Sequence, residues 1–143
     1  MANFGRILGI DVGGKRVGIA RTDLLRTVAN TVATFTPEDS FIEVERQIKE
    51  EGPVIAIVVG WPLTPDGEPT NATQMAQEYY NHLKKRYKDI EIHKMDERYS
   101  TKQAMEALKE AGVSRKRREK KGRLDQAAAA LILREFLEAY PEL

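Results

Sequence analysis

The segment from Leu8 to Ala20 constrains this chain more than any other. It reads Leu-Gly-Ile-Asp-Val-Gly-Gly-Lys-Arg-Val-Gly-Ile-Ala, so an apolar strand leads one carboxylate, Asp11, into a glycine turn and a second strand. A charge at the end of a buried strand is costly unless it binds something. The glycines let a phosphate approach the backbone, and Lys15 and Arg16 add positive charge there. The segment predicts a ligand site of a metal-dependent nuclease or of an ATP-binding phosphotransferase.

The hydrophobic pattern of the first half predicts a β-meander followed by a helix. Strands are expected at about residues 6–12, 16–22 and 28–35. The helix opens at Pro37 and ends at Gly52-Pro53. The continuous apolar run that follows, residues 54–59, is typical of a parallel strand buried on both faces, and we expect it to stop at Gly60.

The second half alternates helix and strand. We expect a helix capped by Asn71, a short strand at about 90–95, a helix at about 101–111 and a final helix. The apolar face of that final helix comprises Leu124, Ala128, Leu131, Ile132 and Phe136. The whole order predicts an α/β fold with a mixed five-stranded sheet, in which an antiparallel meander precedes parallel strands and helices cover the faces.

Length and composition favour one domain, residues 1–143, with a core that needs no cross-links. The chain has no cysteine and only two histidines, which argues against a zinc site. It shows no signal-peptide pattern and no apolar run near the ~20 residues that span a bilayer. We therefore expect a cytoplasmic protein without a membrane partner.

The charge is unevenly distributed. Residues 115–123 contain seven basic side chains and one acidic one, so they contribute +6 to a net charge of +1, and the rest of the chain carries −5. The basic residues are Arg115, Lys116, Arg117, Arg118, Lys120, Lys121 and Arg123. Such a segment either faces a polyanion or is a solvated charged loop, which for a charge run alone is the better interpretation. Gly112 and Gly122 border it and suggest a mobile loop, residues 112–123, that orders on its target.

Three carboxylates, Asp11, Glu97 and Asp125, converge in the expected topology. The first two end strands, and the third lies in the first turn of the last helix. Three such oxygen ligands suit Mg²⁺ or Mn²⁺, and two ions about 4 Å apart activate water and stabilise the leaving oxygen of a phosphodiester. These residues are the predicted catalytic and metal-binding groups.

Each acid also has a structural interpretation. Asp11 can accept hydrogen bonds from the turn amides, and Glu97 can pair with Arg98. An acid in a first helical turn, as Asp125 is, is favoured by the helix dipole alone. Asp96 can replace Glu97 as a ligand. Neither His82, among polar neighbours, nor His93, with no evident partner, is assigned a role, whereas the ring of Trp61 is expected to cover the core rather than stack on a base.

Four segments carry a resemblance to a known family. They are Leu8 to Ala20, Val58 to Leu63 with Asp66-Gly67, Asp96-Glu97-Arg98-Tyr99-Ser100-Thr101, and Asp125 to Leu133. In their order and spacing they resemble the YqgF family, also called RuvX, of RNase H-like proteins, and the match covers essentially the whole chain. Trp61 and Tyr99 stand where Leu is expected, a difference that concerns packing more than chemistry.

The resemblance implies an RNase H-like fold and a metal-dependent nuclease whose acids are Asp11, Glu97 and Asp125. It also implies processing of the 5′ end of pre-16S ribosomal RNA, in a pre-ribosomal particle, while kinship to RuvC leaves a Holliday-junction resolvase as the alternative. Lys15, Arg16, Arg98 and the basic residues of 115–123 are expected to contact the nucleic acid. An enzyme that cuts both strands of a junction symmetrically is expected to be a dimer. The sequence pattern indicates no exposed apolar helix face for a stable dimer, so we expect a monomer or a weak homodimer.

Two other classes of protein fit the sequence less well. The phosphotransferase architecture needs two subdomains to clamp ATP, and 143 residues do not hold two halves. A regulator that binds nucleic acid without chemistry would use the basic segment alone, yet it has no reason to keep three acids beside a phosphate.

Overall fold

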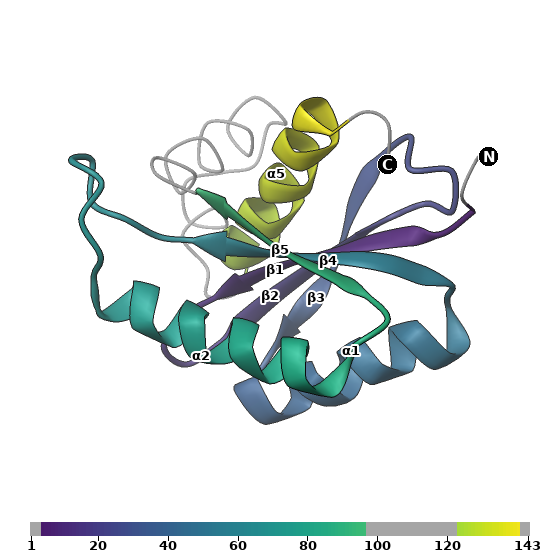
Figure 1. Ribbon diagram of the computed structural model, residues 1–143, viewed down its shortest axis with the longest axis horizontal. Helices are drawn as coiled ribbons and strands as arrows, with labels where there is room; N and C mark the ends of the chain where they lie inside the picture. The colour runs from purple at the N-terminus through teal and green to yellow at the C-terminus, as the bar shows by residue number, and fades with distance from the viewer. Residues whose placement is uncertain (1–3, 97–122, 141–143) are drawn as a thin grey trace.

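The computed structural model describes residues 4–96 and 123–140, with the backbone alone for 123–126. Five strands form one mixed sheet in the order β3-β2-β1-β4-β5 (Figure 1). The strands are β1 (Arg6–Val12), β2 (Val17–Thr22), β3 (Ala29–Phe35), β4 (Val54–Trp61) and β5 (Glu91–Asp96). The β1–β2 and β2–β3 pairs are antiparallel, and the β1–β4 and β4–β5 pairs are parallel. The predicted sheet is therefore confirmed.

Helices cover both faces of this sheet. Helix α1 (Pro37–Glu50) and helix α2 (Asn71–Arg86) lie on one face, and helix α5 (Arg123–Ala139) crosses the other (Figure 1). The start of α1 follows from its sequence: the Thr36 side chain accepts a hydrogen bond from Asp39 N, Pro37 occupies the first turn, and Glu38 and Asp39 complement the helix dipole.

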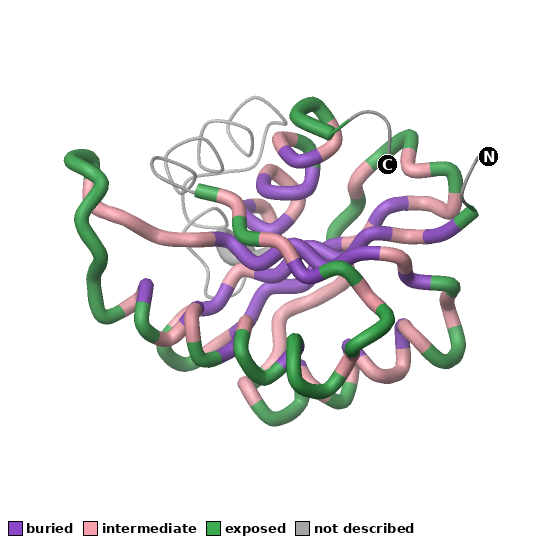
Figure 2. The backbone as a smooth tube through the Cα atoms, in the orientation of Figure 1, coloured by how far each residue is buried: buried purple, intermediate pink, exposed green. Residues whose placement is uncertain are grey.

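Two apolar clusters hold the layers together, one on each face. Leu8, Ile10 and Val12 of β1 pack toward α1 and α2, whereas Ile7 packs toward α5 with Ala129, Ile132, Leu133 and Phe136. The residues of β1, β2 and β4, in the middle of the sheet, are largely buried (Figure 2). This two-sided burial explains why β4 reads as a continuous apolar run.

The structure corrects two predicted boundaries. Strand β4 does not stop at Gly60, because Gly60 and Trp61 continue the ladder with Met95 and Asp96 of β5. The cap of α2 is Thr70 rather than Asn71. The Thr70 side chain accepts from Thr73 N while the Thr73 side chain accepts from Thr70 N, and this reciprocal pair satisfies two amides at once.

Candidate active site

Asp11 lies near the carboxyl end of β1, half-buried, on the face that packs against α5. Strand alternation places Asp11 on this face, because Ile7 and Gly9 precede it at every second position and lie on the α5 side. Gly18 is its partner on β2. On β4, Gly60 follows Val59, the partner of Ile10, and so lies beside Asp11. Asp11 is thus flanked on both neighbouring strands by residues without side chains.

Helix α5 passes close over β1 at Gly9. A Cβ built on Gly9 would lie 2.5 Å from Leu133 Cγ and 2.9 Å from the carbonyl oxygen of Ala129. The C-terminal part of α5, with Leu137 and Glu138, lines a hollow together with the first residues of β3. Because β3 runs in the same direction as β1, α5 runs antiparallel to β1. Asp125 lies one turn before Ala129, which places its backbone toward the end of β1 that carries Asp11.

The remaining predicted site residues fall largely outside the described part of the chain. Glu97, Arg98 and the basic residues from Arg115 to Lys121 lie there, as do the helix predicted at 101–111 and the loop 112–122. Arg123 and Asp125 belong to α5, but their side chains are not described. Among the described residues, no three His, Asp or Glu side chains form a metal site.

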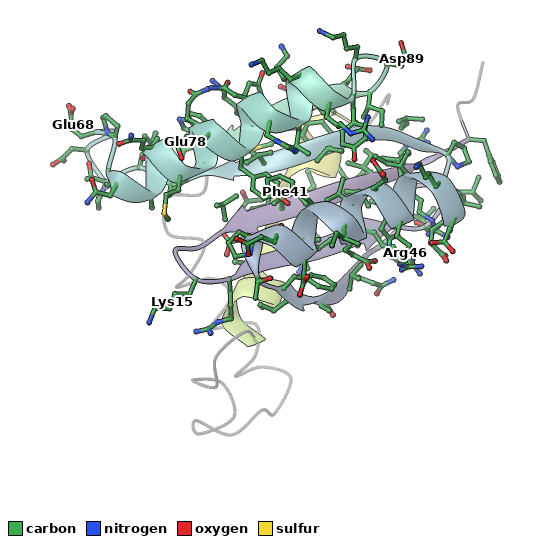
Figure 3. The ribbon with its side chains drawn as sticks, turned by 90° about the horizontal axis from the view of Figure 1, so that it is seen from below. Lys15, Phe41, Arg46, Glu68, Glu78 and Asp89 are labelled. Carbon is green, nitrogen blue, oxygen red and sulfur yellow. The ribbon has the colours of Figure 1, made fainter. Side chains whose placement is uncertain are left out.

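The β1–β2 turn is a tight glycine turn. Gly13 N donates to the Arg16 carbonyl oxygen at 2.8 Å, and a Cβ on Gly13 would lie 2.8 Å from that same oxygen. Lys15 is exposed at the tip of the turn and points away from the body of the protein, whereas Arg16 is half-buried (Figure 3). The turn therefore presents backbone and one free-standing ammonium group at the end of β1.

The end of β5 is acidic. Asp96, the last residue of the strand, is exposed and pairs in register with Trp61. Burial raises the pKa of Glu135 on α5, and the negative charges of Glu138 and Asp96 raise that pKa further. The negative charge of Asp96 on β5 therefore acts on Glu135 of α5.

Trp61 has a structural role, as predicted. Its ring packs against the cluster beneath α1 and α2 and meets the Tyr80 ring edge-on at 6.2 Å between centroids. Lys94 Nζ lies 4.2 Å from the Trp61 ring centroid and 4.7 Å from that of Tyr80. These contacts hold β4, β5 and α2 together beside the site.

Both histidines make contacts that the sequence pattern missed. His93, expected to lack a partner, has its Nε2 3.2 Å from Glu91 Oε1 and its ring 4.9 Å from that of Phe136. His82 is exposed, and its ring lies 4.1 Å from that of Phe41. Strand alternation places Glu91 and His93 on one face of β5, whereas neither alternation nor helical spacing identifies ring partners on another element, such as Phe136 and Phe41.

In the described part of the chain, no helix combines the length and apolar character needed to cross a membrane.

Relatives and solved structures share this architecture. A protein of Salinibacter ruber named "Putative pre-16S rRNA nuclease" is 41% identical over 137 residues, covering 96% of this chain and 95% of the relative. One of the same name from Chlorobium phaeobacteroides is 43% identical over 133 residues, covering 93% and 92%.

Two solved structures resemble the fold at low sequence identity. The fowlpox virus Holliday junction resolvase matches with a TM-score of 0.54 at 12% identity, over 94% of this chain and 99% of that one. Thermus thermophilus RuvC matches with a TM-score of 0.54 at 14% identity, over 95% and 96%. These likenesses establish a RuvC-like, RNase H-like fold.

The model of one family, described as RuvX, Holliday junction resolvase, matches residues 5–139. Together with relatives above 40% identity over nearly the whole length, this match shows that the chain belongs to the RuvX family.

Proposed function

We propose that this chain is a metal-dependent endonuclease that hydrolyses phosphodiester bonds at the 5′ end of pre-16S ribosomal RNA in the cytoplasm. The observation that carries the proposal is the 41% identity, over nearly the full length, to a relative named as a nuclease of that RNA. The course of α5 over β1 supports it, because the backbones of Asp11 and Asp125 lie toward the same edge of the sheet.

The donors at this edge fit a hard divalent cation. Asp11, Glu97 and Asp125 would hold Mg²⁺ or Mn²⁺, and the chain offers no thiolate that would favour a softer metal. When bound, such ions supply an activated water and neutralise charge on the phosphate, in the two-ion manner of many nucleases. The flanking glycines, Gly18 and Gly60, leave room beside Asp11 for a phosphate and its ions.

The strand alternation of β5 supports Glu97 over Asp96 as the second acid. Met95 packs into the cluster beneath α5, so Asp96 occupies a register position on the opposite face of the sheet. Asp11 faces α5. This register position makes Asp96 the less favourable partner for Asp11, although its charge reaches Glu135 on α5, and Glu97, the next acid in the chain, is the proposed second ligand.

Basic residues would position the RNA. Lys15 at the exposed turn and the segment 115–123 would draw in the phosphate backbone by a sequence-independent, salt-sensitive attraction. Arg16 would contribute to the same attraction, and Arg98 would steady the phosphate that is cut. Arg98 would also orient Glu97.

A second candidate is a DNA-junction resolvase, favoured by the description of the matching family model. One experiment separates the two: a 5′-extended pre-16S fragment and a four-way DNA junction are each incubated with the full chain and Mn²⁺ or EDTA. Cutting of the RNA alone, lost with EDTA, is the expected result. Cutting of the junction alone would transfer the proposal to DNA, and binding without cutting would favour a regulator.

A further inference from the structure

A cavity of about 340 Å³ lies on the face of the sheet opposite Asp11, between α1 and α2. Val12 and Val17, paired in register, form its floor beside the glycine turn. Phe41 of α1 and Met75 and Tyr79 of α2 form its walls. Its volume falls within the range of small-molecule sites in proteins.

The walls are flat and held in place. The Phe41 and Tyr79 rings stack with centroids 4.4 Å apart and planes inclined by 18°, and the centroid of the His82 ring lies 4.1 Å from that of Phe41. The Tyr79 hydroxyl is 2.8 Å from Ser40 Oγ, which itself donates to the Pro37 carbonyl oxygen at 2.6 Å. Figure 3 shows Phe41 between the two helices. Fixed aromatic and thioether surfaces favour the binding of a planar ring, such as a nucleobase that is not stacked on its neighbours in the strand.

The polar groups at the cavity indicate which nucleobase this ring belongs to. Among the described residues that line it there is no Lys or Arg; apart from the buried Tyr79, its ionisable side chains are Glu78 and His82, both exposed. A carboxylate offers two acceptor oxygens and no donor. Guanine presents two adjacent N–H donors on its Watson–Crick edge, N1–H and the 2-amino group. Adenine and cytosine place an acceptor nitrogen beside their amino group, which a carboxylate repels.

The cavity also lies within reach of the proposed site. Val12 on its floor follows Asp11 directly in the chain, and the rim between the two faces is the backbone of Gly13 and Gly14. A Cβ on Gly14 would meet nothing nearer than Met75 Cε, at 3.9 Å. An RNA strand with a phosphate at Asp11 can therefore cross the glycine turn and place the next base on the other side.

We propose that the Phe41–Tyr79 cavity binds an unstacked guanine of the RNA strand, adjacent to the phosphate held at Asp11, with the Glu78 carboxylate accepting from its Watson–Crick edge. This inference deepens the proposed function and rests on it: it makes the enzyme selective for guanine one or two nucleotides from the cut.

The direct test needs no cleavage. The ¹⁵N-labelled full chain is titrated with GMP, inosine monophosphate, AMP and UMP, which share the phosphate and differ in the base. GMP should shift the resonances of Gly13, Gly14 and His82, and should bind at least about fivefold more tightly than inosine monophosphate, which lacks the 2-amino group. The same perturbation by all four nucleotides, or none at these residues, would overturn the inference.

Two carboxylate variants, one on α2 and one just after it, make the test of Glu78 specific. Glu78→Gln removes an exposed carboxylate at the cavity and should abolish the preference for GMP over inosine monophosphate. Asp89→Asn removes an exposed carboxylate in the turn that follows the far end of α2 and should leave the preference unchanged (Figure 3). An undiminished preference in Glu78→Gln would contradict the role of that side chain. The absence of metal-dependent RNA cutting, measured in a separate cleavage assay, would instead contradict the proposed function.

Discussion

Gly9 of β1 lies directly beneath Leu133 of α5, with space for no side-chain atom between them. A Cβ at Gly9 would lie 2.5 Å from Leu133 Cγ, well inside any real carbon–carbon contact. This close approach fixes where α5 crosses β1. Asp11 lies two residues beyond Gly9, and Asp125 lies two turns before Leu133. The contact therefore sets the spacing between the two elements that carry the first and third predicted acids.

Gly9→Ala should destabilise the fold and impair the site together. The added methyl group also meets the Ala129 carbonyl oxygen at 2.9 Å, so α5 must shift as a body. Overpacking of this kind costs about 1–3 kcal/mol. Urea unfolding monitored by circular dichroism measures the loss, and metal-dependent cleavage should fall at a temperature where the variant is still folded.

Gly14→Ala is the matched control, because its added Cβ has ordinary contacts only. Its free energy of unfolding should stay within about 0.5 kcal/mol of the wild-type value. Equal stability of the two alanine variants would show that α5 does not depend on the close approach at Gly9.

The loop between β2 and β3 should lose stability in acid. Hydrogen bonds from the Thr27 hydroxyl, at 2.6 Å, and from the Thr27 and Val28 amides lower the pKa of Asp23 to about 2. Since the folded-state pKa lies below the unfolded value near 3.9, the ionised form stabilises the fold above pH 4, and this contribution disappears as the pH falls toward 2. Asp23 is near the surface, so its contribution is about 1 kcal/mol or less.

Thr27→Val tests this relationship. It should raise the pKa of Asp23, measured by carboxyl ¹³C titration, and flatten the loss of unfolding free energy between pH 5 and pH 2. Thr31→Val, at an exposed position of β3, is the control and should leave that pKa unchanged. An Asp23 pKa near 4 in the wild type would contradict the account.

The basic segment should dominate the salt dependence of RNA binding. Replacing Arg115, Lys116, Arg117 and Arg118 with Gln removes four charges. If each contacts a phosphate, the slope of log K against log salt should fall by up to about 3 for single-stranded RNA. Lys85→Gln with Lys88→Gln, at exposed positions near the end of α2, should leave the slope unchanged. A slope unaffected by the first set would mean that the segment is a solvated loop.

Elements with strong local signals were predictable from the sequence. The strand that delivers Asp11, the glycine turn and the apolar β4 run all have short-range patterns, and the structure places them close to where those patterns indicate. The cap of α2 was wrong by one residue because Thr70 and Asn71 both cap well, and the reciprocal bond with Thr73 selects Thr70.

Contacts between distant elements were not predictable in the same way. The Phe41–Tyr79 stack joins residues 38 positions apart on two helices, and the His93–Phe136 contact joins a strand to the last helix. Helical spacing shows only that each residue faces the sheet. Which side chains meet depends on how α1, α2 and α5 cross it, and that follows from the packing of the whole core. The convergence of Asp11, Glu97 and Asp125 stays a prediction.

The most direct test compares the wild-type chain with Asp11→Asn on a 5′-extended pre-16S RNA, with Mn²⁺ or with EDTA, measuring cleavage and binding in the same samples. Asn keeps the size of the side chain and removes the charge that would hold the ion. The variant should cut no faster than the wild type in EDTA, while its affinity for RNA is unchanged or higher because a negative charge near the phosphate is gone. Cleavage by Asp11→Asn at the wild-type rate would contradict the assignment of Asp11 and the proposed mechanism with it.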